Sequence, residues 1–591
     1  MKEDQKNILL FALIAAFALF AWNPIVSYFF PAANPPATKL EKGKSVALPA
    51  PDGGLPANTP RAMRDRAIVL AESPRVAIET PKLKGSINLR GARIDDLELI
   101  DYEETVAPNS PKVRLLSPEG SKGAYYAQFN WSRIRNNQRE TVLGDDVIWQ
   151  ASGTKLTPAA PVTLTTTRDG QRYAIELSVD DGYMFTVKQS VTNLGTGPVE
   201  ASPFGQVVRA EKSTDLDQWA ANVGPVTVAG GKANYLDYSQ VETAMADPVR
   251  GVKFDTRGGW TGYGDHYWLT AVIPAQQADV EMIQQHIPGQ GYRAYSGLAQ
   301  QRIVEPGTRM SYTSRFFAGA KEVKTLDDYG DKLGIDKFSY AIDWGWFRMI
   351  EKPMFYYLDW LFRMVGNFGI AIILLTFTIR GLLFPIAQRQ FASMASMRAI
   401  QPKMKALQER YKDDKQKQQQ EIMKLYKDEK VNPLAGCLPL LLQIPIMFAL
   451  YKVLLLTIEM RHQPFALWVH DLSAPDPATI LNLFGYLPFT PPSFLAIGVF
   501  PVLLGISMYF QIRLNPAPMD EMQKQIFSIM PWMLMFVMAP FAVGLQLYWI
   551  VSNIITIAQQ SWLYSKHPAL KEPIKKDPPK SDPPAKGAKA R

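Results

Sequence analysis

An apolar run with an arginine inside it constrains this chain more than any other feature. Residues 368–387 are mostly Ile, Leu, Phe, Ala and Gly, and a helix of this length covers ~30 Å, enough to cross a bilayer. Arg380 lies inside the run, where a charge costs roughly 2.5–3.5 kcal/mol on insertion scales. Such a residue normally faces a bundle interior or a hydrated cavity. The alternative is that Arg380 lies near the end of the span and reaches the lipid headgroups.

Further apolar segments predict a polytopic α-helical membrane protein with six transmembrane helices. The amino-terminal segment, residues 1–30, carries Lys2 and Lys6 ahead of a long apolar stretch. Its length and its terminal aromatic residues favour a retained anchor, with a cleaved signal peptide as the alternative. The other predicted spans are residues 434–456, 494–510, 526–539 and 543–564.

The distribution of basic residues predicts how these spans are oriented. The formal net charge of +9 is concentrated in residues 389–430 and in the basic tail, residues 566–591, whereas residues 459–493 contain Arg461 as their only Lys or Arg. Because basic loops stay in the cytoplasm, both termini are expected there, and the large domain after the first span is exported.

The region between the first two spans changes character along its length. Residues 31–78 are rich in Pro, Ala and Gly and are predicted to be a flexible linker. Residues 79–340 contain short alternating runs separated by turns, such as Asp169-Gly170 between residues 163–168 and 171–177. This pattern predicts a large all-β sandwich of antiparallel strands.

The exported region offers no catalytic or metal-binding pattern. Its histidines are His266 and His286, and no Cys/His cluster has metal-ligand spacing. Asp265-His266 has the composition of an acid–base pair, but a structural loop histidine is the commoner explanation. The single cysteine, Cys437, excludes an intrachain disulfide. The sequence therefore predicts no enzyme and no cofactor.

Two helical regions flank the Arg380 span. Residues 343–362 mix aromatic and charged side chains and predict an interfacial amphipathic helix, broken near Pro353. Residues 388–430 predict a cytoplasmic helical hairpin with an apolar seam, which either docks partners or only holds the hairpin together. The residues selected as its docking surface are Met397, Met404, Lys412, Asp413, Asp414 and Lys415.

Polar side chains recur at membrane depth in several predicted spans. Thr376, Thr378 and Arg380 share one span and Gln443 lies on another. The last span carries Gln546, Ser552, Asn553, Thr556, Gln559 and Gln560. One or two such groups normally join helices through hydrogen bonds, but a charge with a whole polar series indicates a hydrated recess. No carboxylate relay or phosphate-binding loop indicates a transporter or an ATP-driven pump.

The motifs of the second half are long enough for comparison with known families. Residues 431–454 read VNPLAGCLPLLLQIPIMFALYKVL, residues 464–477 read PFALWVHDLSAPDP, and residues 401–416 read QPKMKALQERYKDDKQ. Together with the Arg380 span they resemble the YidC/Oxa/Alb family of membrane protein insertases, in its Gram-negative YidC type. The resemblance covers residues 343–564 closely and the remainder more loosely.

The resemblance implies a five-helix insertase core (residues 341–565), with a groove open to the cytoplasm and to lipid. Its important arginine matches Arg380, and Thr376 matches a second groove position. An aromatic client contact falls on Trp549, where relatives often have tyrosine, so the choice between Trp549 and Tyr548 stays open. The groove expected to contact clients comprises Arg380, Thr376, Gln443, Trp549, Tyr548, Ser552 and Asn553.

The resemblance also implies a cellular setting. It places the protein in the bacterial inner membrane, with the exported domain in the periplasm as a galactose-mutarotase-like β-supersandwich without known catalysis. The implied partners are nascent membrane proteins, the ribosome, the Sec translocon, the signal recognition particle receptor and membrane lipids, and not DNA. Two other functions remain as alternatives: a secondary transporter of a small solute, and a membrane-tethered sugar-processing enzyme.

Overall fold

The computed structural model describes residues 38–41, 44–47 and 64–566, except 136–137, 214, 216–221, 247–248, 413, 430–437, 485–486, 488–496 and 515–520. The chain divides into two units, residues 1–61 and 62–591. In the first, β1 (Thr38–Glu41) pairs antiparallel with β2 (Lys44–Ala47). The predicted anchor, most of the basic tail and Asp413 lie outside the described residues.

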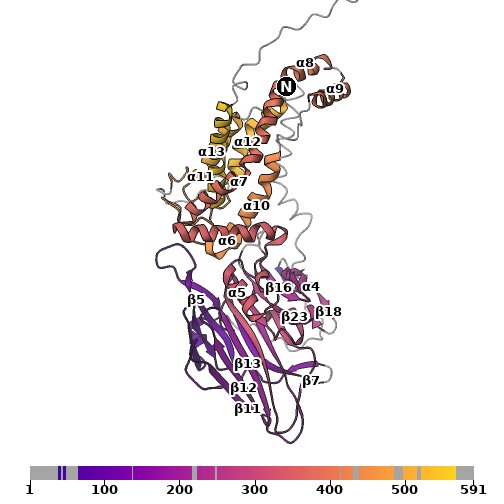
Figure 1. Cartoon of the computed structure of the whole chain (residues 1–591). Helices are drawn as coiled ribbons and strands as arrows, with labels where there is room; N and C mark the ends of the chain where they lie inside the picture. The colour runs from indigo at the N-terminus through magenta and orange to yellow at the C-terminus, as the bar shows by residue number, and fades with distance from the viewer. Residues whose placement is uncertain are drawn as a thin grey trace, which may run out of the picture. The chain divides into compact units, whose positions relative to one another are not determined.

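Two large, mainly antiparallel sheets form the first part of the second unit (Figure 1). The 11-stranded sheet has the order β10 (Lys155–Leu156), β3 (Arg75–Glu79), β4 (Leu83–Asn88), β5 (Arg93–Glu103), β7 (Tyr125–Arg135), β15 (Ser202–Arg209), β24 (Gly291–Leu298), β23 (Asp279–Ile287) and β20 (Val252–Arg257), with β6 (Lys112–Leu116) on β5 and β8 (Gln138–Thr141) on β7. The 9-stranded sheet has the order β17 (Lys232–Tyr235), β16 (Gly224–Ala229), β21 (Trp260–Gly264), β22 (Trp268–Ile273), β26 (Arg309–Ala320), β13 (Met184–Asn193), β12 (Gln171–Val179), β11 (Val162–Arg168) and β9 (Gln150–Ala151). Smaller elements are α3 (Arg66–Ala71), β14 (Val199–Glu200) with β25 (Ile303–Val304), α4 (Tyr238–Thr243), and β18 (Met245–Ala246) with β19 (Val249–Arg250).

Aromatic side chains from both sheets meet in the core between them. Phe129 of β7 packs edge-on against Phe316 of β26, with ring centroids 6.2 Å apart. Trp131 and Phe185 are also almost fully buried. Because alternate residues of a strand point to opposite faces, these positions form a shared hydrophobic layer. The prediction of a large β-domain with two packed sheets is confirmed.

The predicted hairpin at Asp169-Gly170 is confirmed. Arg168 and Gln171 are partners across β11 and β12, and Asp169 and Gly170 both have positive φ, 51° and 75°. Two consecutive left-handed residues match the right-handed twist of the strands, which explains why Asp-Gly closes such hairpins.

The ordered domain begins earlier than the predicted linker boundary at residue 78. Helix α3 is capped by the Asp65 side chain, which accepts from Ala67 N at 2.7 Å, and it buries Val69. Strand β3 pairs along its length with β4. Composition alone predicted a linker here. Pro and Gly content cannot show that β3 pairs with β4, because that pairing depends on the tertiary structure.

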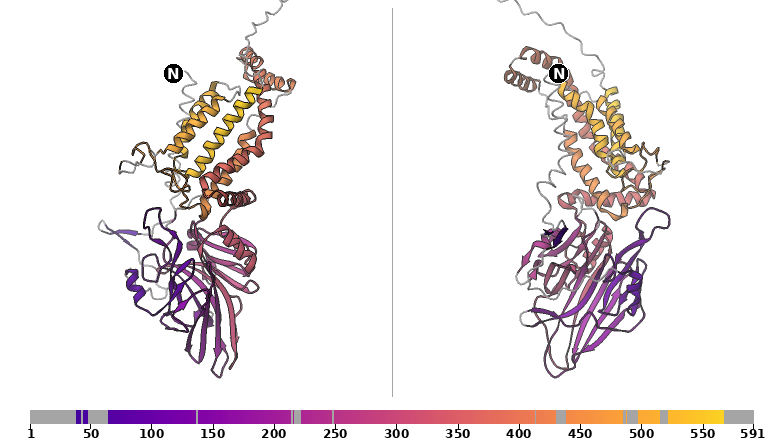
Figure 2. Two further views of the ribbon diagram at one scale, coloured as in Figure 1. Left: turned by 60° about the vertical axis from the view of Figure 1, so that its left-hand side comes forward. Right: turned by 180° about the vertical axis from the view of Figure 1, so that it is seen from behind.

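The second half of this unit is helical (Figure 2). Its elements are α5 (Val323–Leu333), η1 (Phe338–Ala341), η2 (Gly345–Phe347), α6 (Arg348–Val365), α7 (Phe368–Ala399), α8 (Gln401–Arg410), α9 (Lys415–Asp428), α10 (Leu438–Leu456), η4 (Ile458–Met460), α11 (Val499–Leu514), α12 (Glu521–Met538) and α13 (Val543–Lys566). Among the described residues, one segment, Phe368–Gln388, is long and apolar enough to cross a membrane, and Gln443–Leu456, Val499–Leu514 and Phe527–Met538 are shorter apolar helices.

The predicted break near Pro353 is wrong. Helix α6 runs through Pro353 and α7 runs through Pro385 to Ala399. Pro353 lies in the second turn of α6, so only one backbone hydrogen bond near the helix start is lost. Buried side chains on one face, including Phe355 and Leu358, keep α6 continuous. It crosses the base of the other helices (Figure 1).

Candidate functional site

Arg380 is held by a hydroxyl group from the last helix. Its Nε donates to Ser552 Oγ at 2.8 Å, and Nη2 also contacts this oxygen. Ser552 is fully buried, whereas Arg380 is half-buried. Among the described residues, no carboxylate forms an ion pair with Arg380. A neutral hydroxyl satisfies hydrogen bonds but leaves the positive charge uncompensated.

Two further polar side chains extend this contact to a third helix. Tyr548, one turn before Ser552 on α13, accepts a hydrogen bond from Gln443 Nε2 of α10 at 2.9 Å. The Tyr548 side chain is fully buried and lies near enough to Arg380 to interact electrostatically. We call Arg380, Gln443, Tyr548 and Ser552 the polar cluster. It joins α7, α10 and α13 with four of the seven side chains predicted for the groove.

The other three predicted groove residues point elsewhere. Thr376 is fully buried, and its hydroxyl donates to Ile372 O of its own helix at 2.7 Å. Asn553 Nδ2 donates to Ser507 Oγ of α11 at 3.0 Å. Trp549 is half-buried and packs against the hydrophobic core. Successive residues of a helix face directions about 100° apart, which separates Trp549 and Asn553 from the polar cluster.

The predicted hairpin is present as α8 and α9. Tyr426 of α9 contacts Met404 of α8, with 3.3 Å between Oη and Sδ. Asp414 caps α9 by accepting from Lys417 N at 3.0 Å. Met397 lies on α7, outside the hairpin, because α7 continues to Ala399. Lys412 is exposed, and Lys415 begins α9.

Several polar contacts were not anticipated from the sequence. Thr378 of α7 shares a hydrogen bond with Tyr357 of α6, 2.8 Å between their hydroxyl oxygens. Lys452 is buried near the end of α10 and donates to Asp343 O at 2.7 Å. The sequence feature that could have predicted the Lys452 contact is a lysine within an apolar run. In the same way, Ser507 within an apolar run could have predicted the bond to Asn553.

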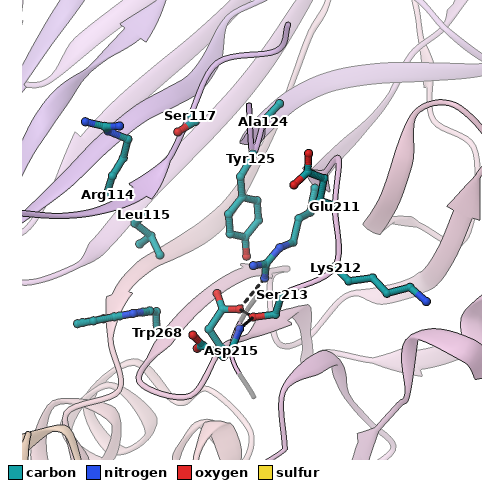
Figure 3. A pocket seen from close by; sticks show the side chains of 13 residues that line it. Arg114, Leu115, Ser117, Ala124, Tyr125, Glu211, Lys212, Ser213, Asp215 and Trp268 are labelled. Carbon is teal, nitrogen blue, oxygen red and sulfur yellow. Dashed lines mark hydrogen bonds and ion pairs between the residues drawn. The ribbon is translucent and has the colours of Figure 1, made fainter. Parts of the chain in front are cut away.

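The β-domain contains a separate polar cavity of about 240 Å³ (Figure 3). Arg209 on its wall pairs with Asp265 at 2.7 Å and lies over the ring of Tyr125, 4.8 Å from its centroid. His266, adjacent in sequence, instead contacts Leu455 O of α10 through Nε2 at 2.7 Å, and burial lowers its pKa. Asp265 and His266 therefore have separate partners and form no acid–base pair.

A buried carboxyl group lies where the chain leaves α10. Glu459 of η4 accepts from Val323 N of α5 at 2.9 Å through Oε1, and its Oε2 is shielded from solvent without a hydrogen-bond partner. Burial raises the pKa of this carboxyl to about 7. The cause is physical: a charged oxygen without water or a cation is unfavourable in such surroundings.

The chain joins a helical core to a large two-sheet domain. The core contains an apolar span and an arginine without a paired carboxylate. This combination is typical of membrane proteins that carry a β-domain outside the membrane. Residues 360–571 match the family model described as 60Kd inner membrane protein, and residues 75–357 match the YidC periplasmic domain. The membrane protein insertase YidC of Zymomonas mobilis is 44% identical over 574 residues, 97% of each chain. That of Sinorhizobium fredii is 43% identical over 578 residues, 95% of each chain.

The chain belongs to the YidC family of membrane protein insertases. It is a non-enzymatic inner-membrane protein with a periplasmic β-domain. A crystal structure described as an active YidC insertase with its first transmembrane domain resolved is 16% identical, covers 92% of this chain and 98% of its own, and has a TM-score of 0.36.

Proposed function

We propose that the polar cluster forms the floor of a groove in which Arg380 receives acidic or polar groups of an incoming client. The observation that carries this proposal is the pairing of Arg380 with the Ser552 hydroxyl in the absence of a carboxylate among the described residues. An uncompensated cation in a poorly hydrated site attracts an anion strongly. The hydroxyl and amide groups beside it replace part of the water that the client loses.

The driving force proposed for insertion is burial of the client's own apolar helix in lipid. Release from the groove removes apolar surface from water at ~25 cal/mol per Å², so a typical membrane segment supplies the free energy without nucleotide hydrolysis. The groove lowers the free-energy barrier for moving the polar end of the client across the membrane. Burial of the apolar helix in lipid makes the overall step favourable.

Of the two candidate aromatic residues, we propose that Trp549 contacts the client and Tyr548 positions Arg380. The Tyr548 side chain is fully buried and its hydroxyl is occupied by Gln443. Trp549 is half-buried, so part of its ring is available. In this proposal Asn553 joins α13 to α11 through its bond to Ser507. Thr376 is a buried structural residue whose hydroxyl is bonded to its own helix.

The proposed topology has six spans with both termini in the cytoplasm, an anchor at 1–30, a periplasmic domain ending near 340 and a core at 341–565. The α8–α9 hairpin and the tail at 566–591 would then dock the ribosome, the signal recognition particle receptor or the Sec translocon. Charge supports this proposal: both regions are rich in Lys and Arg, as cytoplasmic loops and RNA-contacting surfaces are.

Site-specific photocrosslinking tests the groove. A photoreactive residue replaces Trp549, and the protein is mixed with stalled ribosomes carrying a small membrane protein. The matched control replaces Ile554, which lies on the same helix with 55% of its side chain exposed. We expect client adducts from position 549 that disappear when the client lacks its apolar segment, and only lipid adducts from 554. Equal client adducts at both positions, or lipid adducts alone at 549, would refute the proposed groove.

A further inference from the structure

The segment between α10 and α11 exposes large apolar side chains. They are separated in sequence but belong to one periplasmic connection in the proposed topology. We call this set the apolar rim; its members and exposed fractions are Leu467 83%, Ile480 50%, Leu481 48%, Leu483 54% and Phe484 52%. Contiguous exposed apolar residues on a protein mark a contact with lipid or with another protein.

The backbone of the rim adopts a conformation that large side chains avoid. Leu467, Leu483 and Phe484 have φ of 57°, 50° and 60°. Among the described residues, these are the only large apolar side chains with positive φ. A left-handed residue with a Cβ is sterically strained, and such strain usually accompanies function. In water the rim would combine this cost with exposed apolar surface.

Hydrogen bonds hold the segment in this strained shape. Asp476 is buried and accepts from Trp468 Nε1 at 3.0 Å, from Ala478 N at 3.0 Å and, through its second oxygen, from Phe500 N at 2.8 Å. Phe484 N in turn donates to Thr479 O at 2.8 Å. One carboxylate therefore ties the segment to the first turn of α11.

The charged side chains of the segment are few, and local hydrogen bonds engage them. Residues 462–487 contain no Lys or Arg, and their only carboxylates are Asp471 and Asp476. Asp471 accepts from the Ser473 hydroxyl at 2.6 Å and from His462 N at 3.2 Å. Both acids thus satisfy the local backbone, so no side-chain charge of this segment is left to solvate the rim.

We propose that the apolar rim inserts into the outer leaflet of the inner membrane, with lipid acyl chains as its partner. The segment connects the apolar helices α10 and α11. Both cross the membrane in the proposed topology, on which this inference rests, so the ends of the segment would be held at the bilayer surface. Burying Leu and Phe side chains among acyl chains is favourable, and this offsets the strain of the left-handed backbone. A protein partner is less favoured, because stable protein interfaces add hydrogen bonds and charged groups at their edge.

The rim adds an anchor that the groove proposal does not require. It would fix the depth of the periplasmic ends of α10 and α11 in the leaflet, independently of Arg380. It would also place Trp468, whose indole nitrogen is bound to Asp476, at the level where tryptophan is enriched in membrane proteins.

A single-cysteine fluorescence experiment tests the inference in the full chain. Cys437 is the only cysteine, so Cys437→Ser provides the background for Phe484→Cys labelled with an environment-sensitive fluorophore. The protein is reconstituted in phosphatidylethanolamine–phosphatidylglycerol vesicles with the β-domain outside. The control is Ile303→Cys on β25, 62% exposed. Leu467→Cys repeats the test at the other left-handed site, in case the change at 484 disturbs folding.

We expect the probes at 484 and 467 to show blue-shifted emission, quenching by nitroxides on lipid acyl chains and protection from aqueous iodide. The probe at 303 should be quenched by iodide alone. Quenching of both rim probes by iodide would overturn the inference, because the rim would then face water. Protection from both quenchers would also overturn it, because another protein or part of this chain would be the occupant.

Discussion

Arginines of the β-domain are paired with carboxylates, whereas the arginine of the helical core is not. Arg209 pairs with Asp265 at 2.7 Å, and Arg93 contacts Asp145 at 2.9 Å as well as Glu119. Arg75 is likewise paired with Asp95. Arg380 has the Ser552 hydroxyl in their place. Removing one partner of a buried ion pair is strongly destabilising, so we assign the β-domain arginines a structural role. The proposed function instead uses the uncompensated charge of Arg380 to attract an incoming group.

The largest expected effect lies on the compensated side of this comparison. Arg209→Ala leaves Asp265 buried without its cation and should lower the free energy of unfolding by about 3–5 kcal/mol, measured by thermal or urea unfolding of the full chain in detergent. The double variant Arg209→Ala/Asp265→Asn should recover part of that loss. No loss in the single variant would mean that this pair does not stabilise the β-domain.

Two buried or partly buried carboxyl groups show the same contrast between a charge with a partner and a charge without one. Glu322 is paired with Lys82 at 2.7 Å, whereas burial of the unpaired Glu459 raises its pKa from 4.5 to about 7. The folded state therefore holds this proton more tightly, and stability falls as pH rises from about 4.5 to about 7. The ionisation penalty, up to roughly 3 kcal/mol, is complete above pH 7.

Glu459→Gln removes that penalty and can still accept from Val323 N. The variant should be more stable than the parent at pH 8, and the difference should vanish near pH 4.5, as measured by thermal unfolding across this range. Glu322→Gln is the matched control and should be destabilising at pH 8, because it leaves Lys82 without its partner. A difference between Glu459→Gln and the parent that does not change with pH would contradict the assignment.

The uncompensated side of the comparison should affect activity more than stability. Arg380→Ala should reduce insertion of a small membrane protein by about tenfold or more, which corresponds to ~1.4 kcal/mol or more, in a protease-protection assay with reconstituted vesicles. Arg380→Lys should retain much of the activity because it keeps the charge. Insertion by the alanine variant at the parental rate would remove Arg380 from the mechanism.

The smallest effect is expected from the edge of the polar cluster. Tyr548→Phe removes the acceptor of the Gln443 amide and should destabilise the protein by ~1 kcal/mol. Tyr548→Phe/Gln443→Leu removes both polar groups and should recover part of this loss in thermal unfolding. If the proposed roles hold, insertion should fall less in Tyr548→Phe than in Trp549→Ala. The reverse order would exchange the two roles.

Local chemistry was sufficient for much of this protein. Asp169-Gly170 specified a hairpin because few residue pairs adopt two left-handed conformations, and the apolar run around Arg380 specified a membrane helix. Composition was less reliable where the structure depends on residues further along the chain. Most of β3 falls in the region predicted to be a linker, yet it forms a strand because it pairs with β4. Pro353 indicated a break in the interfacial helix, yet α6 runs through it.

The sequence by itself determined that a charge enters the apolar helices, and that polar side chains recur on the helices that could surround it. Only the tertiary structure decided which of them meet. Arg380 and Ser552 are 172 residues apart, and Gln443 and Tyr548 are 105 apart. Each residue type is compatible with several helix faces, and the packing of α7, α10 and α13 selects one. That packing depends on the summed contacts of all three helices, which no local pattern contains.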